Sequence, residues 1–330
     1  MADLVRAAIT GLGGYVPQKI LSNEDFEKLI DTSDEWITKR TGIKERRIAG
    51  ENETTATMAA DAARPALADA GIGADELDLI ICATISPEMT FPATACFVQQ
   101  ALGAKNIPAF DLGAACSGFV YALAAGDQFV RTGMYKNVLV IGADTLSRLT
   151  DYEDRSSCIL FGDAAGAAVL QPTTDPGKGI EYSVLGCDGA GWDYICVPGG
   201  GSRHPASHKT VDDKMHYIKM RGREVFRFAV EKMEWLMADC MEKCCLNVDD
   251  VDLIVPHQVN IRIIKAAVEK FSFPIEKVAL NIDRYGNSSA ASVPFALAEA
   301  YEDGRIGPGS VVILLAFGAG LTWAASVVRL

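Results

Sequence analysis

The sequence contains few positive charges for its size. Its 330 residues include 31 Lys and Arg against 43 Asp and Glu, which gives a net charge of −12 at pH 7. An excess of negative charge repels the phosphates of nucleic acids and the headgroups of anionic membranes. We therefore expect neither nucleic acid nor a membrane as a partner, and any acidic protein partner would need a local cluster of basic residues.

Paired cysteines and a targeting signal are also missing. The nine cysteines are odd in number and form no Cys-x-x-Cys pair, which is typical of a reduced, cytoplasmic protein. Cys240, Cys244 and Cys245 share a predicted helix and raise the question of metal binding, but no His or second Cys cluster lies nearby to complete a ligand set. Packing is the preferred interpretation, and no metal is expected. The start, Met1–Arg6, has neither a basic region nor a long apolar run, so no secretory signal is expected.

One long stretch, Ile306 to Val328, carries no charge. It is interrupted by Gly307, Pro308 and Gly309, and again by glycines at 318 and 320, and its β-branched residues fall into two groups. Two buried strands around a glycine turn explain this pattern better than a membrane-spanning helix.

Strand-like and helix-like segments alternate along the chain, which predicts an α/β fold with layered sheets. The expected strands are Val5–Gly11, Leu79–Thr84, Ala109–Leu112, Val138–Gly142, Ala164–Leu170, Gly179–Leu185, Leu253–Pro256, Lys277–Asn281, Val311–Phe317 and Trp323–Val328. The expected helices include Thr54–Ala70, Thr94–Leu102, Gly118–Arg131, Gly222–Cys245, Ile261–Phe271 and Ser292–Asp303.

The two sets of strands resemble each other. Leu77-Asp-Leu-Ile-Ile is similar to Val251-Asp-Leu-Ile-Val, and Val138-Leu-Val-Ile-Gly to Val311-Val-Ile-Leu-Leu, with nearly the same separation along the chain. An internal repeat of this kind predicts two similar halves, residues 1–175 and 176–330. Nearly the same separation makes Asn287 the expected counterpart of Cys116.

Cys116 lies between a predicted strand, Pro108 to Leu112, and a predicted helix, Ser117 to Arg131. At such a turn a thiol meets the positive end of the helix dipole and unpaired backbone N–H groups, which lower its pKa. Cys116 is therefore a candidate nucleophile. The competing interpretation is a small buried cysteine that packs a strand–helix junction.

Histidine is scarce, with four residues in all. His204 and His208 lie within Cys187–Asp213, which is rich in Gly, Pro, Ser and Asp and is predicted to be a long irregular loop, of a length that is typical of functional loops or of loops that cover a site. His216 is expected to be an ordinary, partly buried residue. His257 follows a predicted apolar strand, where α/β proteins place catalytic groups, so it is the best candidate partner for Cys116.

The whole chain is similar to the β-ketoacyl-acyl-carrier-protein synthase III family, the initiating condensing enzymes of fatty acid synthesis, within the thiolase-like superfamily. The matching stretches are Asp31-Thr-Ser-Asp-Glu-Trp-Ile, Arg40-Thr-Gly-Ile, Ala114-Ala-Cys-Ser-Gly-Phe, Phe161-Gly-Asp, Pro256-His-Gln-Val-Asn-Ile-Arg, Tyr285-Gly-Asn-Ser-Ser-Ala-Ala-Ser and Phe317-Gly-Ala-Gly-Leu-Thr-Trp. The resemblance implies two βαβαβαββ halves in a five-layered α-β-α-β-α architecture. It also implies a homodimer without a permanently bound cofactor.

For the reaction, the resemblance implies a catalytic triad of Cys116, His257 and Asn287. Cys116 would take the acyl group of an acyl-CoA primer, and the backbone N–H groups of Cys116 and Ala319 would bind the oxyanion. His257 and Asn287 would then donate hydrogen bonds to the thioester of malonyl-acyl carrier protein during decarboxylative Claisen condensation. A role for His257 as the base for Cys116 remains open at this point.

The resemblance also implies three binding regions. Coenzyme A would be held by Thr32, Trp36, Arg40, Arg155 and Asn260, with the adenine between Trp36 and Arg155. The acyl pocket would be shaped by Phe91, Leu146, Phe161 and Phe317, whose sizes do not fix the primer. The acidic carrier protein would dock on Gln258, Val259, Asn260, Ile261, Arg262, Arg223 and Arg227, although these arginines also fit a solvated helix face. Some family members differ at Ser156, Arg223 and Val259.

Two other functions remain as alternatives. A related condensing enzyme could prime a polyketide or quinolone-type pathway instead of fatty acid synthesis. A thiol hydrolase could use Cys116 and His257, although no Asp or Glu that would orient the histidine is evident.

Overall fold

Two β-sheets form the framework of the protein. The computed structural model describes residues 5–330, so the expectation for the start of the chain lies mostly outside the described residues. The first sheet has the strand order β1-β7-β6-β4-β5, in which β4 pairs parallel with β5 and β6 while β7 and β1 are antiparallel to their neighbours. Its strands are β1 (Arg6–Tyr15), β4 (Leu79–Ala83), β5 (Ala109–Leu112), β6 (Val138–Thr145) and β7 (Asp163–Thr173).

The second sheet repeats this topology with one strand fewer. Its order is β11-β12-β13-β8, with β11 parallel to β12 and the other pairs antiparallel. Its strands are β8 (Gly179–Cys187), β11 (Leu253–Pro256), β12 (Val311–Gly318) and β13 (Thr322–Arg329). The predicted strand Lys277–Asn281 is wrong: at the place of a fifth strand, Val278 makes a single parallel bridge to Ile254.

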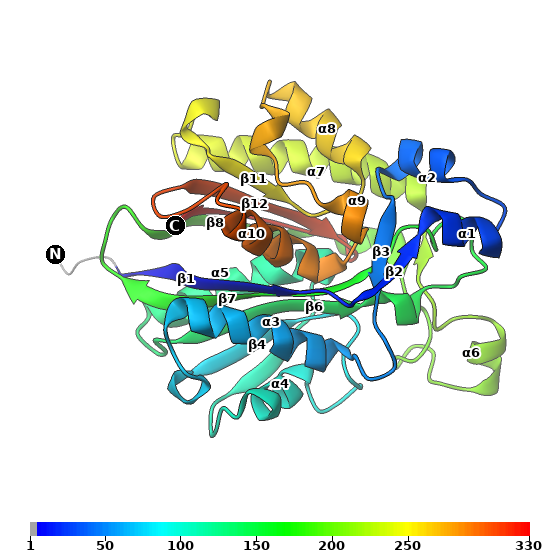
Figure 1. Ribbon diagram of the computed structural model, residues 1–330, viewed down its shortest axis with the longest axis horizontal. Helices are drawn as coiled ribbons and strands as arrows, with labels where there is room; N and C mark the ends of the chain where they lie inside the picture. Colours follow the sequence, from blue (N-terminus) through cyan, green and yellow to red (C-terminus); the bar gives the residue numbers. More distant parts are fainter. Residues whose placement is uncertain (1–4) are drawn as a thin grey trace.

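Helices cover both sheets and fill the space between them, which gives five layers (Figure 1). On the outside of the first sheet lie α3 (Thr55–Ala70) and α4 (Thr94–Leu102), and on the outside of the second sheet lie α7 (Gly222–Lys243) and α8 (Ile261–Lys270). The central layer holds α5 (Gly118–Arg131) and α10 (Ser292–Glu302). The predicted α-β-α-β-α architecture is confirmed, and the proposed division at residue 175 falls in the connection between β7 and β8.

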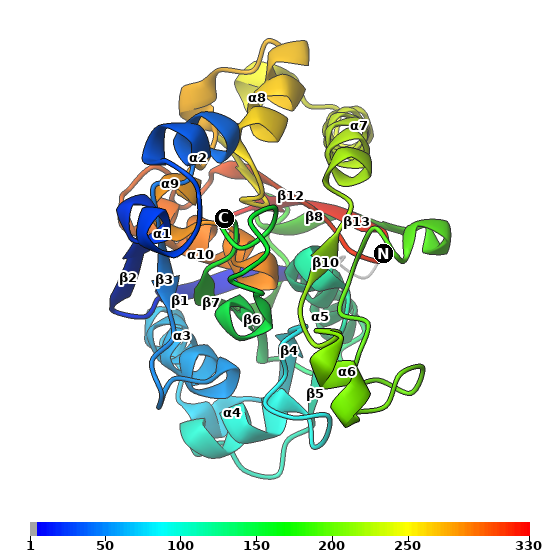
Figure 2. The ribbon, with the colours of Figure 1, turned by 90° about the vertical axis from the view of Figure 1, so that its right-hand side faces the viewer.

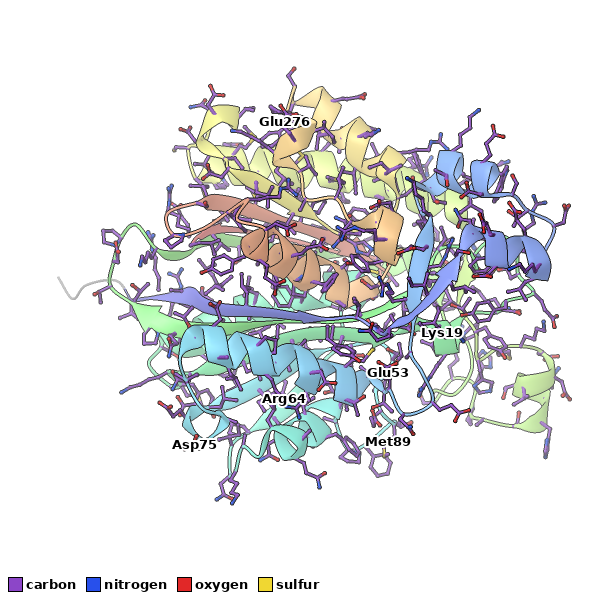
Figure 3. The ribbon with its side chains drawn as sticks, viewed as in Figure 1. Lys19, Glu53, Arg64, Asp75, Met89 and Glu276 are labelled. Carbon is purple, nitrogen blue, oxygen red and sulfur yellow. The ribbon has the colours of Figure 1, made fainter. Side chains whose placement is uncertain are left out.

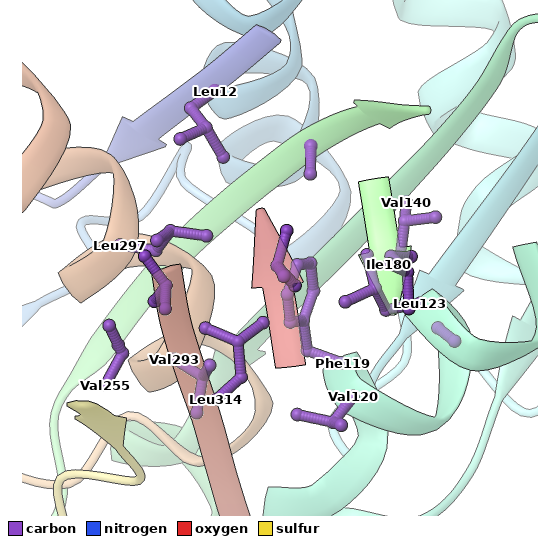
Figure 4. Close-up of a cluster of buried hydrophobic side chains, with 14 of the residues drawn as sticks. Leu12, Phe119, Val120, Leu123, Val140, Ile180, Val255, Val293, Leu297 and Leu314 are labelled. Atoms are coloured by element: carbon purple, nitrogen blue, oxygen red, sulfur yellow. The ribbon is translucent and has the colours of Figure 1, made fainter. Parts of the chain in front are cut away.

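The central layer is held by an apolar core to which both sheets contribute. Phe119 and Leu123 of α5 and Val293 and Leu297 of α10 are buried there with residues of both sheets (Figure 4). Glycines let α10 approach the first sheet closely: a Cβ at Gly142 would lie 2.3 Å from the carbonyl oxygen of Ala290. This close contact fixes the start of α10 against the end of β6.

A small unit at one end of the molecule was not foreseen in detail. It contains β2 (Lys19–Ser22), α1 (Asn23–Leu29), α2 (Asp34–Thr41), β3 (Glu45–Ile48) and α9 (Ile282–Tyr285). The fully buried Arg46 holds it together, because its guanidinium donates to the Asn23 side chain at 2.7 Å and to the carbonyl of Ile159 and lies over the Phe26 ring.

The segment Cys187–Asp213 is more ordered than the sequence suggests. It contains the two-residue strand β9 (Ile195–Cys196), which pairs with β10 (Lys219–Met220), and the short helix α6 (His208–Asp212). Ser207 caps α6. Figure 1 shows α6 at the same end of the molecule as α1 and α2, the end that faces the viewer in Figure 2. Ile195 and Cys196 of β9 and Met220 of β10 line the cavity that contains the catalytic candidates.

The uncharged stretch near the C-terminus forms β12 and β13, as predicted, with Gly318 paired to Thr322 at the turn. Among the described residues no helix has the length and apolar character needed to span a bilayer. Nor does any group of three or more His, Cys, Asp or Glu side chains in residues 5–330 form a possible metal site. Cys240 is instead packed in the core between α7, α8 and the second sheet.

Candidate active site

Cys116 lies at a tight turn between β5 and α5, as predicted. The turn is a short 3₁₀ helix, Ala115–Ser117, and Ala115 adopts a left-handed conformation with φ of 47°. The Gly318 backbone lies directly against it, since a Cβ at Gly318 would be 2.7 Å from the Cys116 nitrogen. The turn that presents the thiol is therefore built jointly by β5, α5 and the end of β12.

An apolar cavity of about 230 Å³ brings the three predicted triad residues together. Cys116, His257 and Asn287 all line it, although they come from three separate strand–helix connections. Ala319, which the resemblance places at the oxyanion site, lines the same cavity. Most of the remaining wall is aliphatic or aromatic, so charges that develop inside are poorly solvated by water.

Burial controls the charge of the thiol. Cys116 is partly accessible through the cavity, but protein atoms surround its sulfur, and this burial raises the pKa of the thiol to about 12. The nearby Ser289 hydroxyl acts in the opposite direction and lowers the pKa, while the Asp144 carboxylate raises it. The expectation of a lowered thiol pKa at this turn is therefore wrong, because desolvation is the largest effect on the thiol.

His257 is a buried, neutral imidazole. Burial lowers its pKa to about 3, and its Nδ1 lies 2.6 Å from the hydroxyl of Ser292, the first residue of α10. The Ser292 oxygen also accepts a bond from the Gln258 N–H at 3.4 Å, which leaves its own proton for Nδ1. This arrangement favours the tautomer in which His257 presents Nε2–H as a donor.

Asn287 is held so that its amide nitrogen is the polar group left for the cavity. Its side-chain oxygen accepts the Ser289 N–H at 2.9 Å. Its backbone is fixed on both sides, since its N–H donates to Leu160 and its carbonyl accepts from Gly162. With the oxygen already bonded, the NH₂ group can act as a donor to a bound substrate.

Two backbone N–H groups at the cavity have no carbonyl partner among those recorded for residues 5–330. Neither the Cys116 nor the Ala319 N–H donates to a backbone carbonyl outside the regular helices and strands of residues 5–330. The Cys116 N–H instead acts on its own sulfur and lowers the pKa of the thiol. N–H groups that line an apolar cavity beside a nucleophile have the character of an oxyanion hole.

The structure corrects the repeat partner of Cys116. The turn Ala115–Ser117 before α5 corresponds to the turn Ser289–Ala291 before α10. Their first residues, Ala115 and Ser289, share the left-handed conformation, with φ of 47° and 50°. The counterpart of Cys116 is therefore Ala290, and Asn287 lies three residues earlier.

Three of the four predicted acyl-pocket residues, Leu146, Phe161 and Phe317, line the cavity. Phe91 does not line it and is 81% exposed. Met89, two residues earlier, is also exposed and lies at the outside of the molecule near α4 (Figure 3). Within the single chain, Phe91 therefore does not reach this cavity, and its place in the acyl pocket stays a prediction.

A second, larger cavity of about 660 Å³ opens beside the first and is rich in arginine. It is lined by four of the five residues expected to bind coenzyme A, namely Trp36, Arg40, Arg155 and Asn260. The guanidinium carbons of Arg155 and Arg40 lie 5.0 and 5.4 Å from the Trp36 ring centre. An adenine between Trp36 and Arg155 would require these side chains to separate. Thr32 does not line the cavity, and its buried hydroxyl has no hydrogen-bond partner within residues 5–330.

Three of the seven residues of the expected docking surface, Asn260, Arg223 and Arg262, line this second cavity. Arg223 and Arg262 line it, and Arg262 lies over the Phe226 ring, which brings the starts of α7 and α8 together. Arg223, Arg227 and Arg262 are exposed, while Val259, Asn260 and Ile261 are half-buried. Gln258 is an exception: it is buried, and its amide bonds the carbonyls of Pro256 and Ala279. It therefore supports the fold and is not part of this surface.

Ser292, Asp144 and Ser289 are functional-site residues that the sequence did not single out. Ser289 and Ser292 lie inside the quoted stretch after Tyr285, but serine in a run of small residues carries no sign of its neighbours. The signal that could have identified them is their position in a turn that repeats the Cys116 turn.

The fold defines a thiolase-like protein, and its cavity joins a cysteine to a buried histidine and an asparagine. Models of 3-oxoacyl-[acyl-carrier-protein] synthase III match residues 110–189, and those of its C-terminal part match residues 241–330. A β-ketoacyl-[acyl-carrier-protein] synthase III of Caldanaerobacter subterraneus subsp. tengcongensis is 53% identical over 100% of this chain and 99% of its own. The chain belongs to the β-ketoacyl-acyl-carrier-protein synthase III family, and it is an acyltransferase that performs the initiating condensation of fatty acid biosynthesis.

Solved structures agree with this assignment. The 3-oxoacyl-[acyl-carrier-protein] synthase III of Aquifex aeolicus has a TM-score of 0.90 and 47% identity, covering 98% of this chain and 100% of that one. The priming β-ketosynthase of the R1128 polyketide pathway has a TM-score of 0.91 and 35% identity, covering 98% and 96%.

Proposed function

We propose that Cys116 carries the acyl group between the two stages of the condensation. In the first stage its sulfur attacks the thioester of an acyl-CoA, the bond to the CoA sulfur breaks, and CoA leaves with the thiol proton. The N–H groups of Cys116 and Ala319 bind the oxyanion of the tetrahedral intermediate. The observation that carries this proposal is the single apolar cavity in which the thiol, two donor side chains and both N–H groups meet.

In the second stage malonyl-acyl carrier protein enters the same cavity. His257 Nε2–H and the Asn287 amide donate to the thioester carbonyl and stabilise the enolate that forms as CO₂ leaves. The enolate carbon then attacks the acyl carbon, and the Cys116 sulfur is expelled, giving 3-oxoacyl-acyl carrier protein. Support comes from the Ser292 and Ser289 contacts, which leave both side chains free as donors.

The role of a donor for His257 is preferred to that of a base. A base must accept a proton, and burial holds the pKa of His257 near 3, well below neutral pH. No charged group within residues 5–330 is a cause of this shift, so no partner offsets the cost of an imidazolium.

We further propose that the nucleotide of acyl-CoA binds in the larger cavity. Arg40, Arg155, Arg223 and Arg262 supply positive charge for its phosphates, and Trp36 supplies an aromatic surface. We place the carrier protein on the exposed arginines at the same mouth. A homodimer in the cytoplasm with no permanently bound cofactor completes the proposal, and the nine unpaired cysteines fit a reducing compartment.

A priming role in a specialised pathway is the second candidate, because the R1128 priming synthase shares this fold. The primer itself, acetyl or a longer or branched acyl group, stays unassigned. A thiol hydrolase is less well supported, since no carboxylate of residues 5–330 bonds to His257, whose Nδ1 is held by Ser292.

Intact-mass analysis after incubation with a series of acyl-CoAs tests the proposal. The wild-type chain should gain one acyl group, mapped to Cys116, and Cys116→Ala should gain none while still decarboxylating malonyl-acyl carrier protein. Condensation by Cys116→Ala at the wild-type rate would overturn the proposal. Comparing carrier-protein and free-CoA acceptors separates fatty acid priming from the specialised alternative.

A further inference from the structure

Ser289 has a hydroxyl that the mechanism above does not use. Its side chain is completely buried, and its oxygen makes no hydrogen bond with any group of residues 5–330. It nevertheless lines the cavity that holds Cys116 and Asn287. Leaving a buried hydroxyl without a partner costs free energy, so its retention beside a nucleophile points to a partner that forms during the reaction.

The position of this hydroxyl is fixed by the turn that carries it. Ser289 adopts a left-handed conformation with φ of 50°. Its N–H donates to the Asn287 side chain at 2.9 Å, and the next N–H, of Ala290, donates to the Asp144 carboxylate at 3.1 Å. Strained backbone that is held from both sides is characteristic of functional sites.

The Asp144 carboxylate already accepts five hydrogen bonds from groups other than the Ser289 hydroxyl. One of its oxygens accepts bonds from the Thr84 hydroxyl, the Ile85 N–H, and both the N–H and the hydroxyl of Ser86. The other oxygen accepts the Ala290 N–H. The second oxygen keeps a free acceptor site, and the Ser289 hydroxyl acts to lower the pKa of Asp144 as well as that of Cys116. It makes no direct hydrogen bond to the carboxylate, so it can turn towards the sulfur.

We propose that Ser289 is a further catalytic residue, which donates a hydrogen bond to the Cys116 sulfur whenever that sulfur carries negative charge. The inference rests on the proposed function, in which Cys116 is the nucleophile. The sulfur is charged twice: as it attacks acyl-CoA, and as it is expelled when the carbon–carbon bond forms. A neutral thiol is a weak acceptor and a thiolate is a strong one, so the bond forms mainly in the charged states and speeds both steps.

The atoms balance in both steps. In the first, the carbon–sulfur bond to CoA breaks as the bond to Cys116 forms, and the thiol proton leaves with CoA. In the second, the carbon–carbon bond forms, the bond to Cys116 breaks, and a proton from water restores the thiol. Ser289 keeps its own proton throughout.

Two titratable side chains, Asp144 and His257, also contribute to the surroundings of the Cys116 sulfur. Asp144, from the end of β6, raises the pKa of Cys116, and His257, after β11, is neutral and lines the same cavity. The Ser289 hydroxyl lowers the pKa of Cys116. It therefore opposes the destabilisation that the buried carboxylate imposes on a thiolate.

The test measures single-turnover acylation of Cys116 by intact mass in Ser289→Ala and Ser289→Gly. Both remove the donor, and glycine also adopts the left-handed conformation freely. Acylation should slow by roughly 10- to 100-fold in both variants, the range expected for one hydrogen bond to a charged group. The pH at which iodoacetamide alkylates Cys116 at half the maximal rate should rise. Ser288→Ala, in the same turn but outside the cavity, is the matched control and should behave as wild type.

Decarboxylation separates this role from a structural one. In the Cys116→Ala background, which lacks the sulfur, adding Ser289→Ala should leave malonyl-acyl carrier protein decarboxylation within about twofold, because Asn287 keeps its backbone contact. Wild-type acylation rates in both Ser289 variants would overturn the inference, as would equal losses of acylation and decarboxylation. Failure of the proposed function itself would look different: the wild-type chain would not be acylated at Cys116.

Discussion

The chemistry of individual residues in this protein is set by what surrounds each side chain. His257 and Cys116 are both kept uncharged by the apolar cavity, since burial lowers the pKa of one and raises that of the other. Asn287 is turned into a donor because its oxygen is already bonded. Each role therefore depends on a neighbour, and the most informative neighbours are Ser292 and Ser289.

Buried His257 predicts a specific loss of stability in acid. Its pKa is about 3 in the folded protein and about 6.5 in an unfolded chain. Between these values the unfolded chain binds the proton and the folded protein does not, so stability falls as the pH drops below 6.5. From pH 7 to pH 5 this contributes a loss of about 2 kcal/mol.

Urea unfolding of the wild-type protein and of His257→Gln at both pH values checks this expectation. The variant lacks the titrating group, so its stability should fall by about 2 kcal/mol less than that of the wild type over the same range. An identical pH dependence in the two proteins would show that His257 is not held neutral.

At the scale of elements, the active site is an arrangement of strand ends and turns. The Cys116 turn follows β5, His257 follows β11, and Asn287 precedes α10. The end of β12 closes the site, because Gly318 packs on the Cys116 backbone without room for a side chain. The reactive geometry therefore depends on contact between the two halves of the chain.

Gly318→Ala tests this contact. The added Cβ would lie 2.7 Å from the Cys116 nitrogen, so the turn or the strand must shift. We expect a stability loss of about 1–3 kcal/mol and a fall in single-turnover acylation of at least about tenfold.

Gly307→Ala serves as the control, since a Cβ there meets nothing within 4 Å. Melting temperature and acylation rate are measured for both variants. An unchanged acylation rate in Gly318→Ala would mean that the exact position of the Cys116 turn is unimportant.

The pattern of elements was largely predictable, and the exceptions have physical causes. The strands and helices around Cys116 follow from apolar periodicity, which is a local property. Lys277–Asn281 has a strand-like pattern but forms one bridge, because strand formation depends on a partner edge that local sequence does not encode. The pairing of the two-residue strands β9 and β10 across a loop could not be predicted for the same reason, because it also depends on a partner edge that is distant in sequence.

The net charge of the whole molecule affects how an acidic protein partner can bind. The chain carries a net charge of −12, yet arginines gather at the starts of α7 and α8 around the larger cavity. Such a local patch can steer an acidic partner despite net repulsion, and steering of this kind weakens with salt.

Arg227→Glu separates docking of the carrier protein from binding of CoA. Arg227 is exposed near this mouth but does not line the cavity. We expect the KM for malonyl-acyl carrier protein to rise by roughly tenfold at low salt, with less difference at high salt, because exposed charges act mainly on association.

Acylation of Cys116 by acyl-CoA should be unchanged in Arg227→Glu. Arg64→Glu, on α3 in the opposite outer layer, is the control and should leave both steps unaltered (Figure 3). An equal rise in KM for both Arg227→Glu and Arg64→Glu would indicate net charge alone and would argue against a docking patch.

The sequence by itself determined the fold class and the repeat, because periodicity is a local property of the chain, and it determined the family through the matching motifs. The triad of Cys116, His257 and Asn287 is what that resemblance implies. Only the tertiary structure decided which residues meet. It showed that Ser292 bonds to His257 and that Ser289 lies beside Cys116. It also showed that Gln258 is buried and that Phe91 does not line the pocket of its own chain. The counterpart of Cys116 in the second half is Ala290. The tertiary structure also reversed the expected pKa of the thiol. These outcomes depend on burial and on contacts between distant segments, and both arise only when the two halves pack together.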